Sequence, residues 1–134
     1  MKTLNIATAC FLNNQQELLV VRKKNTFAWM LPGGKLDCDE TASEALVREL
    51  AEELQIEVDI SALHLLGKFT AVAANEVNTS VNAHVFLGRL ANGQTPIHAA
   101  EIEAMKWLSI RDPLPEGIAP LLKNSIIPIL QSMQ

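Results

Sequence analysis

The chain is poor in several residue types and patterns that would place it in a specialised class of protein. It has no tyrosine, and aromatic residues make up only 4% of its 134 positions. Its two cysteines, Cys10 and Cys38, are fewer than a small disulfide-stapled secreted domain normally carries, so reduced thiols and a cytoplasmic location are expected. Because no apolar run approaches the ~18–20 residues needed to cross a bilayer, no membrane span is expected either.

Positive charge is also in short supply. The formal net charge is −4 and the isoelectric point is about 5.3, which gives no overall attraction to a nucleic-acid backbone or to an anionic membrane. A small molecule is therefore a better candidate partner than a polymer. Hydrophobic residues make up 49% of the chain, enough for residues 1–134 to form one compact domain with its own core.

Strand patterns occur in two pairs and one single segment. Residues 4–12 and 17–22 are rich in apolar and β-branched side chains and flank the polar run 13–16, which predicts a β-hairpin. A second hairpin is predicted from residues 63–74 and 79–90. A further strand is expected over residues 104–110.

Two segments have helical spacing instead. Residues 41–54 place apolar side chains on one stripe, and Thr41 with Glu44 forms the pattern of a capping box. Residues 118–130 are also helical in period, although Pro128 weakens the pattern. Alternation of sheet and helix predicts an α/β protein in which a mixed sheet packs between helices as a three-layer α/β/α sandwich.

The first helix carries three carboxylates, Glu49, Glu52 and Glu53, on one face that we expect to be turned to solvent. Positions three and four apart are neighbours on a helix, so these acids repel one another unless something compensates for their charge. A divalent cation such as Mg²⁺, which takes oxygen ligands, would do so. The alternative is an ordinary solvated acidic face, in which Arg48 pairs with Glu44 and Glu52.

Spacing around these acids resembles the Nudix box, Gx5Ex7REUxEExGU, where U is a bulky aliphatic residue. Eight of its nine specified positions are matched, by Gly34, Glu40, Arg48, Glu49, Leu50, Glu52, Glu53 and Ile56. The departure is Gln55, where the pattern has a glycine that ends the helix in a left-handed conformation. A residue with a Cβ there costs about 1 kcal/mol but removes no metal ligand. The preceding loop, residues 31–35, and Trp107 also look like family features.

The resemblance implies a Nudix-type fold and a hydrolase that depends on Mg²⁺, with Mn²⁺ as a substitute. It implies that Glu49, Glu52 and Glu53 are the metal ligands and that Glu40 and Arg48 brace the loop against the helix. Gly33 and Gly34 would let the loop backbone approach metal and substrate closely. Phosphate contacts are expected from Lys35 and Arg22, which lie near this loop in sequence.

A carboxylate must also accept a proton from the attacking water. The family often uses a late glutamate for this purpose, which favours Glu101 over its neighbour Glu103. Glu53 and Glu49 are the remaining candidates for the catalytic role.

The substrate is expected to be a nucleoside triphosphate, because the chain looks most like MutT-type enzymes, whose substrates include 8-oxo-dGTP. However, Ile118 falls where that type has an asparagine that reads oxidised guanine. Phe27, Trp29 and Trp107 are candidates for stacking on a base, whereas His64, His84 and His98 lack ligand spacing. The alternatives are hydrolysis of ADP-ribose or a dinucleoside polyphosphate, and a non-catalytic nucleotide-binding module. The protein is expected to be a monomer or a homodimer.

Overall fold

The computed structural model describes residues 2–90 and 94–133 of the chain. Short 3₁₀ and π segments accompany its helices and strands. In chain order the elements are β1 (Lys2–Phe11), β2 (Glu17–Lys23), β3 (Gly33–Lys35), α1 (Ala42–Leu54), a 3₁₀ turn (Ile60–Ala62), β4 (His64–Val72), β5 (Thr79–Gly88), β6 (Ile102–Ser109), a π-helical turn (Leu122–Ile126) and α2 (Ile127–Ser132).

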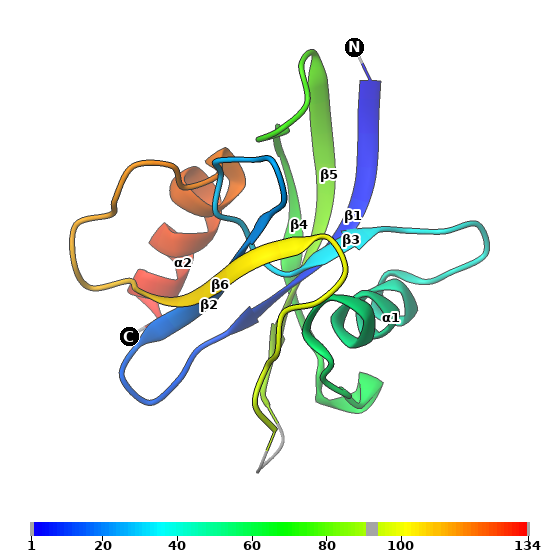
Figure 1. Ribbon diagram of the computed structural model, residues 1–134, viewed down its shortest axis with the longest axis horizontal. Coiled ribbons are helices and arrows are strands. Elements are labelled where there is room, and N and C mark those ends of the chain that lie inside the picture. The colour runs from blue at the N-terminus through cyan, green and yellow to red at the C-terminus, as the bar shows by residue number, and fades with distance from the viewer. Residues whose placement is uncertain (1, 91–93, 134) are drawn as a thin grey trace.

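The strands form two sheets. The larger has the order β3-β1-β5-β4 and is mixed, because β1 runs parallel to β5 while β3 and β4 are antiparallel to their neighbours. The smaller sheet pairs β2 with β6 in antiparallel fashion. Figure 1 shows α1 and α2 on opposite sides of these strands. The arrangement confirms the expected α/β sandwich with a mixed sheet.

Strand alternation explains the layers. Successive side chains of a strand point to opposite faces, so Ala7 and Ala9 of β1 pack in the cluster that contains the buried leucines of α1. Cys10 and the β2 residue Leu18 pack instead in the cluster that contains the π-helical turn and α2. Each helix therefore covers its own apolar core, and the sheets lie between the two cores.

The predicted hairpin between the first two strands is wrong beyond its turn. Asn13 N–H does donate to Glu17 O at 3.0 Å, and Leu12 bridges Leu18. The strands then separate, because β1 pairs with β3 and β5 while β2 pairs with β6. Tertiary pairing with distant strands overrides the local turn signal here. The second predicted hairpin, β4 with β5, is confirmed with slightly shorter strands.

Both ends of α1 follow the sequence closely. Thr41 Oγ1 accepts from Glu44 N–H and a Glu44 carboxylate oxygen accepts from Thr41 N–H, which completes the predicted capping box. At the other end, Gln55 adopts φ 54° and ψ 37°, the left-handed conformation in which the family pattern has glycine. The helix thus stops at the expected residue even though the side chain there is unfavourable.

The helix predicted over residues 118–130 starts at Pro120, two residues later than expected. It contains a π-helical turn. Ile127 N–H donates to Leu122 O, five residues back, immediately before Pro128. Proline lacks an N–H and its ring collides with the carbonyl four residues earlier, and a π-turn is one way to absorb that defect. Within the described residues, no helix is long and apolar enough to cross a membrane.

Candidate active site

The glycine strand β3 is pressed between β1 and α1. A Cβ on Gly33, whose φ is 142°, would lie 2.0 Å from Ala7 O, and a Cβ on Gly34 would lie 2.5 Å from the Glu49 carboxyl carbon. Glycine is therefore required at Gly33, where a Cβ would collide with the backbone of β1. At Gly34 a side chain would displace the carboxylate end of Glu49, so this glycine keeps the loop backbone against the carboxylate face of α1.

Glu53 is the most enclosed carboxylate of this face. It is only 5% exposed, and its Oε1 accepts from Gly33 N–H at 3.3 Å. Burial raises the pKa of Glu53 to about 7, and the nearby charges of Glu49 and Glu101 act in the same direction, against the Gly33 N–H and Lys23. Our expectation of a solvent-facing position is therefore wrong for Glu53. It holds for Glu52, whose side chain is 55% exposed.

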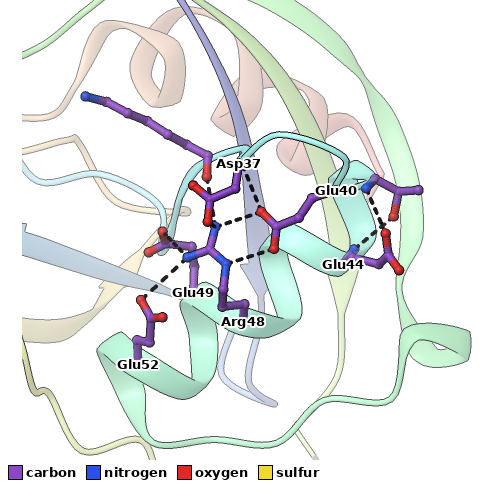
Figure 2. A network of polar contacts seen from close by, with 8 residues as sticks. Asp37, Glu40, Glu44, Arg48, Glu49 and Glu52 are labelled. Carbon is purple, nitrogen blue, oxygen red and sulfur yellow. Dashed lines mark hydrogen bonds and ion pairs between the residues drawn. The ribbon is translucent and has the colours of Figure 1, made fainter.

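Arg48 holds the preceding loop to the helix. Its Nε and Nη2 donate to the two carboxylate oxygens of Glu40 at 2.8 and 2.9 Å, and Nη2 also donates to Lys35 O at 3.1 Å (Figure 2). The hydrogen bonds from Arg48, together with one from Asp37 N–H, lower the pKa of Glu40 to about 2. The pair expected between Glu40 and Arg48 is thus present, and it is bidentate.

The same guanidinium lies among three further carboxylates. Arg48 Nη1 is 3.0 Å from Glu49 Oε1 and 3.6 Å from Glu52 Oε2, while Nη2 is 3.4 Å from Asp37 Oδ2 (Figure 2). Sequence reasoning missed Asp37, because nothing in the helical period or the box pattern marks it. Glu44, a predicted alternative partner of Arg48, is engaged instead by the cap of α1.

Glu101 reaches the site through a segment that packs on the end of α1. Ala99 N–H donates to Glu53 O at 2.8 Å and Ile97 N–H donates to Leu54 O at 2.9 Å, so this segment satisfies carbonyls at the helix terminus. Glu101 follows two residues later, is exposed, and is one of the charges that raise the pKa of Glu53. Its neighbour Glu103 lies within β6 and is exposed.

The basic residues near the glycine strand have different surroundings, although Arg22 and Lys35 were both expected to contact phosphates. Arg22 donates to Thr26 O at 2.9 Å, and its guanidinium lies 5.7 Å from the centre of the Trp29 ring. Lys23, the next residue of β2, is the cation that acts on Glu53. Lys35 is 60% exposed, with Nζ 4.0 Å from Glu76. Strand alternation, with an irregularity between Arg22 and Lys23, separates these two neighbours.

A cavity of about 260 Å³ begins at the glycine strand and runs away from α1. Gly33, Gly34, Lys23 and Lys35 border it, and apolar side chains from β1, from the segment before β3 and from the π-helical turn line its interior, among them Ile6, Met30, Leu31 and Leu122. A largely apolar hollow with a few polar groups is typical of a small-molecule site. The glycine strand separates it from the carboxylate helix, since Gly33 and Gly34 border the cavity and also contact Glu53 and Glu49 of α1.

The aromatic candidates separate clearly by exposure. Phe27 is 92% exposed and lines a shallower hollow that shares Thr26 and residues 72–75 with the cavity. Trp29 packs on the α2-side core with Lys106 Nζ 4.4 Å from its ring centre, and Trp107 packs on the α1-side core. Ile118 is 9% exposed and bridges Trp29. Phe27 is thus the most exposed of the three aromatic candidates, and it lies in the hollow beside the cavity.

The carboxylates fit a hard divalent cation by their chemistry. Glu49 and Glu52 both approach one cationic atom, Arg48 Nη1, and Glu53 is buried with a raised pKa, so negative charge is in excess here. Within residues 2–90 and 94–133 no three His, Cys, Asp or Glu side chains stand together as a ready-made metal site. The reason is visible in Figure 2, where Glu49 and Glu52 are turned toward Arg48.

Comparison with known proteins agrees with this geometry. The NUDIX domain family matches residues 3–127. The chain is 34% identical to the "Putative 8-oxo-dGTP diphosphatase" of Bacillus subtilis over 73% of its own length and 61% of that protein's. It is 29% identical to the CTP pyrophosphohydrolase of Escherichia coli over 98% and 92% of the two chains. The chain thus spans about three fifths of the first of these relatives and most of the second.

The fold is shared with solved structures as well. The crystal structure of a MutT NUDIX hydrolase from Burkholderia pseudomallei superposes with a TM-score of 0.77 over the whole of both chains, at 24% identity. The chain therefore belongs to the Nudix family.

Proposed function

We propose that the protein hydrolyses a phosphoanhydride bond of a nucleoside triphosphate with the help of Mg²⁺, releasing the monophosphate and pyrophosphate. The observation that carries this proposal is the contact between the glycine strand and the acidic face of α1, at the mouth of an apolar cavity. A base in the cavity would place its phosphates beside the carboxylates. The names of the two relatives, an 8-oxo-dGTP diphosphatase and a CTP pyrophosphohydrolase, support the class of substrate.

Glu49, Glu52 and Glu53 would hold the cation, with Mn²⁺ as a substitute. When bound, it would neutralise phosphate charge and lower the pKa of water. The protein's own groups would do the rest. Arg48 and Glu40 keep the glycine strand against the helix, and Lys23 and Lys35 border the cavity at the phosphate end. Glu101, which is exposed beside Glu53, would accept the proton of the attacking water.

The test is a nucleotide panel assayed with Mg²⁺, with Mn²⁺ and with EDTA. It should contain the common ribo- and deoxynucleoside triphosphates, 8-oxo-dGTP, ADP-ribose and a dinucleoside polyphosphate, scored for both nucleotide and phosphate products. We expect monophosphate and pyrophosphate from at least one triphosphate, and none in EDTA. Preferential cleavage of ADP-ribose or of the dinucleotide would contradict the proposed substrate class, and turnover in EDTA would contradict the metal requirement.

A further inference from the structure

The segment that leads to Glu101 is bonded to the chain just beyond α1 by a side-chain amide. Gln94 Nε2 donates to Glu57 O at 2.9 Å, and Gln94 Oε1 accepts from Glu57 N–H at 2.8 Å. One amide thus satisfies both backbone groups of Glu57, as a neighbouring strand would. Because α1 ends at Leu54, this pair of hydrogen bonds fixes the segment next to the helix terminus.

Further contacts with the helix terminus follow along the same segment. Pro96 is buried, and its ring fixes φ, which limits how far the backbone can bend there. Two residues apart, Ile97 and Ala99 donate to the carbonyls of Leu54 and Glu53. The segment is thereby tied to the same residue that supplies the buried carboxylate of the site.

A tight turn carries this constraint on to Glu101. Ile102 N–H donates to Ala99 O at 3.0 Å, which closes a turn over Ala100 and Glu101. Ala100 has a φ of 53°, a left-handed conformation that is unfavourable for a residue with a Cβ. Glu101 O then accepts from Lys24 N–H at 2.8 Å. Since Ala99 bonds to α1 through its N–H and to the start of β6 through its carbonyl, the position of Glu101 depends on how the segment lies on the helix.

We infer that Gln94 is a positioning residue, whose amide fixes the segment on the end of α1 and so holds Glu101 in place at the site. This inference rests on the proposed function, in which Glu101 takes the proton of the attacking water, and deepens it. A misplacement of about 1 Å can cost roughly a hundredfold in rate, so a contact remote from the chemistry can matter. Gln94 bonds to the backbone of Glu57 and not to reacting atoms, so it positions a catalytic group and is not one itself.

A double-mutant cycle tests whether Gln94 acts through Glu101. Turnover of each nucleoside triphosphate that the wild type hydrolyses would be measured at saturating Mg²⁺ for Gln94→Ala, Glu101→Gln and the double variant. We expect Gln94→Ala to lower kcat about threefold to tenfold with KM within about twofold, and to have no further effect in the Glu101→Gln background. General destabilisation would instead slow both backgrounds equally.

Two further variants sharpen the cycle. Gln94→Glu should be slowed less than Gln94→Ala, because a carboxylate of the same length can still accept from Glu57 N–H although it cannot donate to Glu57 O. Thr95→Ala, at the exposed neighbouring position, is the matched control and should keep wild-type kcat.

Hydrogen exchange of the metal-free full chain, followed by NMR, gives a readout that does not depend on turnover. Gln94→Ala should speed exchange of the Ile97 and Ala99 amides about tenfold, since the segment loses two hydrogen bonds. The Ala45 amide, at the other end of α1, should not change. Unchanged exchange at Ile97 and Ala99, unchanged kcat, or equal slowing of both backgrounds by Gln94→Ala would overturn the inference. Faster exchange in a protein that hydrolyses no triphosphate would sustain the role of Gln94 in fixing the segment and refute the proposed hydrolysis.

Discussion

The two faces of the β1–β3 contact differ in how their polar groups are satisfied. On the α1 side, Arg48 alone contacts Glu40, Glu49, Glu52, Asp37 and the Lys35 carbonyl. On the cavity side, the Thr8 hydroxyl has no partner among the described residues. The first face is held together by its own charges, whereas the second is lined mainly by apolar side chains. The proposed function makes the first face the chemical end and the second the recognition end, separated by the thickness of one strand.

The strongest way to break the chemical end is to neutralise its carboxylates. We expect Glu52→Gln and Glu53→Gln each to lower turnover at least about a hundredfold, since each removes a charged ligand candidate while keeping its shape. Steady-state kinetics over a range of Mg²⁺ concentrations would check this. Glu57→Gln, an exposed acid beyond the helix, is the matched control. Near wild-type rates in both box variants would refute the metal assignment.

Glu101→Gln should slow turnover by about tenfold to a thousandfold, as expected for loss of a general base. Glu101 is chosen because its charge acts on Glu53. The decisive measurement is a pH–rate profile of Glu101→Gln beside Glu103→Gln at saturating Mg²⁺. Loss of the acidic limb in Glu103→Gln alone, or in neither variant, would move the base to Glu103 or to a box glutamate.

The buried position of Glu53 predicts a pH-dependent cost in the metal-free protein. Its pKa rises from the usual value near 4.5 to about 7 on folding, so the folded state holds this proton more tightly than the unfolded state does. The contribution of Glu53 to stability is then greatest below pH 4.5 and falls as pH rises toward 7, by about 2–3 kcal/mol. In EDTA at pH 8, Glu53→Gln should therefore unfold at higher urea than wild type. The same or a lower midpoint would contradict the burial argument.

At the recognition end, Phe27→Ala should raise KM about fivefold with little change in kcat, because stacking on an exposed ring contributes at the low end of the usual 1–3 kcal/mol per base. Phe27→Trp keeps an aromatic face and is the control. Melting temperatures should not change, since Phe27 is 92% exposed. If Phe27→Ala has the same KM as wild type, the base does not stack on Phe27.

The smallest expected effect is at the end of α1. Gln55→Gly should raise the melting temperature by a few degrees, because glycine adopts the left-handed conformation at about 1 kcal/mol less cost. Gln55→Ala, which removes the side chain but keeps the Cβ, should not. Rates should stay within about twofold in both. A large loss of activity in Gln55→Gly would give this residue a direct part in the site.

Much of the chemical end could be predicted because it is local in sequence. The capping box at Thr41, the helix stop at Gln55 and the pairing of Glu40 with Arg48 depend on residues fewer than a dozen positions apart. Helical geometry brings residues three and four positions apart together whatever the rest of the chain does, whereas the pairing of Arg48 with Glu40, which precedes the helix, was implied by the family pattern. The family pattern then supplied the roles, and matching of residues 3–127 to the NUDIX domain agrees with it.

Only the tertiary structure decided the remainder. The burial of Glu53 depends on Gly33, twenty residues away. Lys23, and not the predicted Arg22, is the cation that acts on Glu53, and this depends on the irregular pairing of β2 with β6. The apolar cavity likewise depends on tertiary structure, because β1 lines it together with the late π-helical turn. Each of these results from contacts between distant segments, for which local propensity and period carry no information.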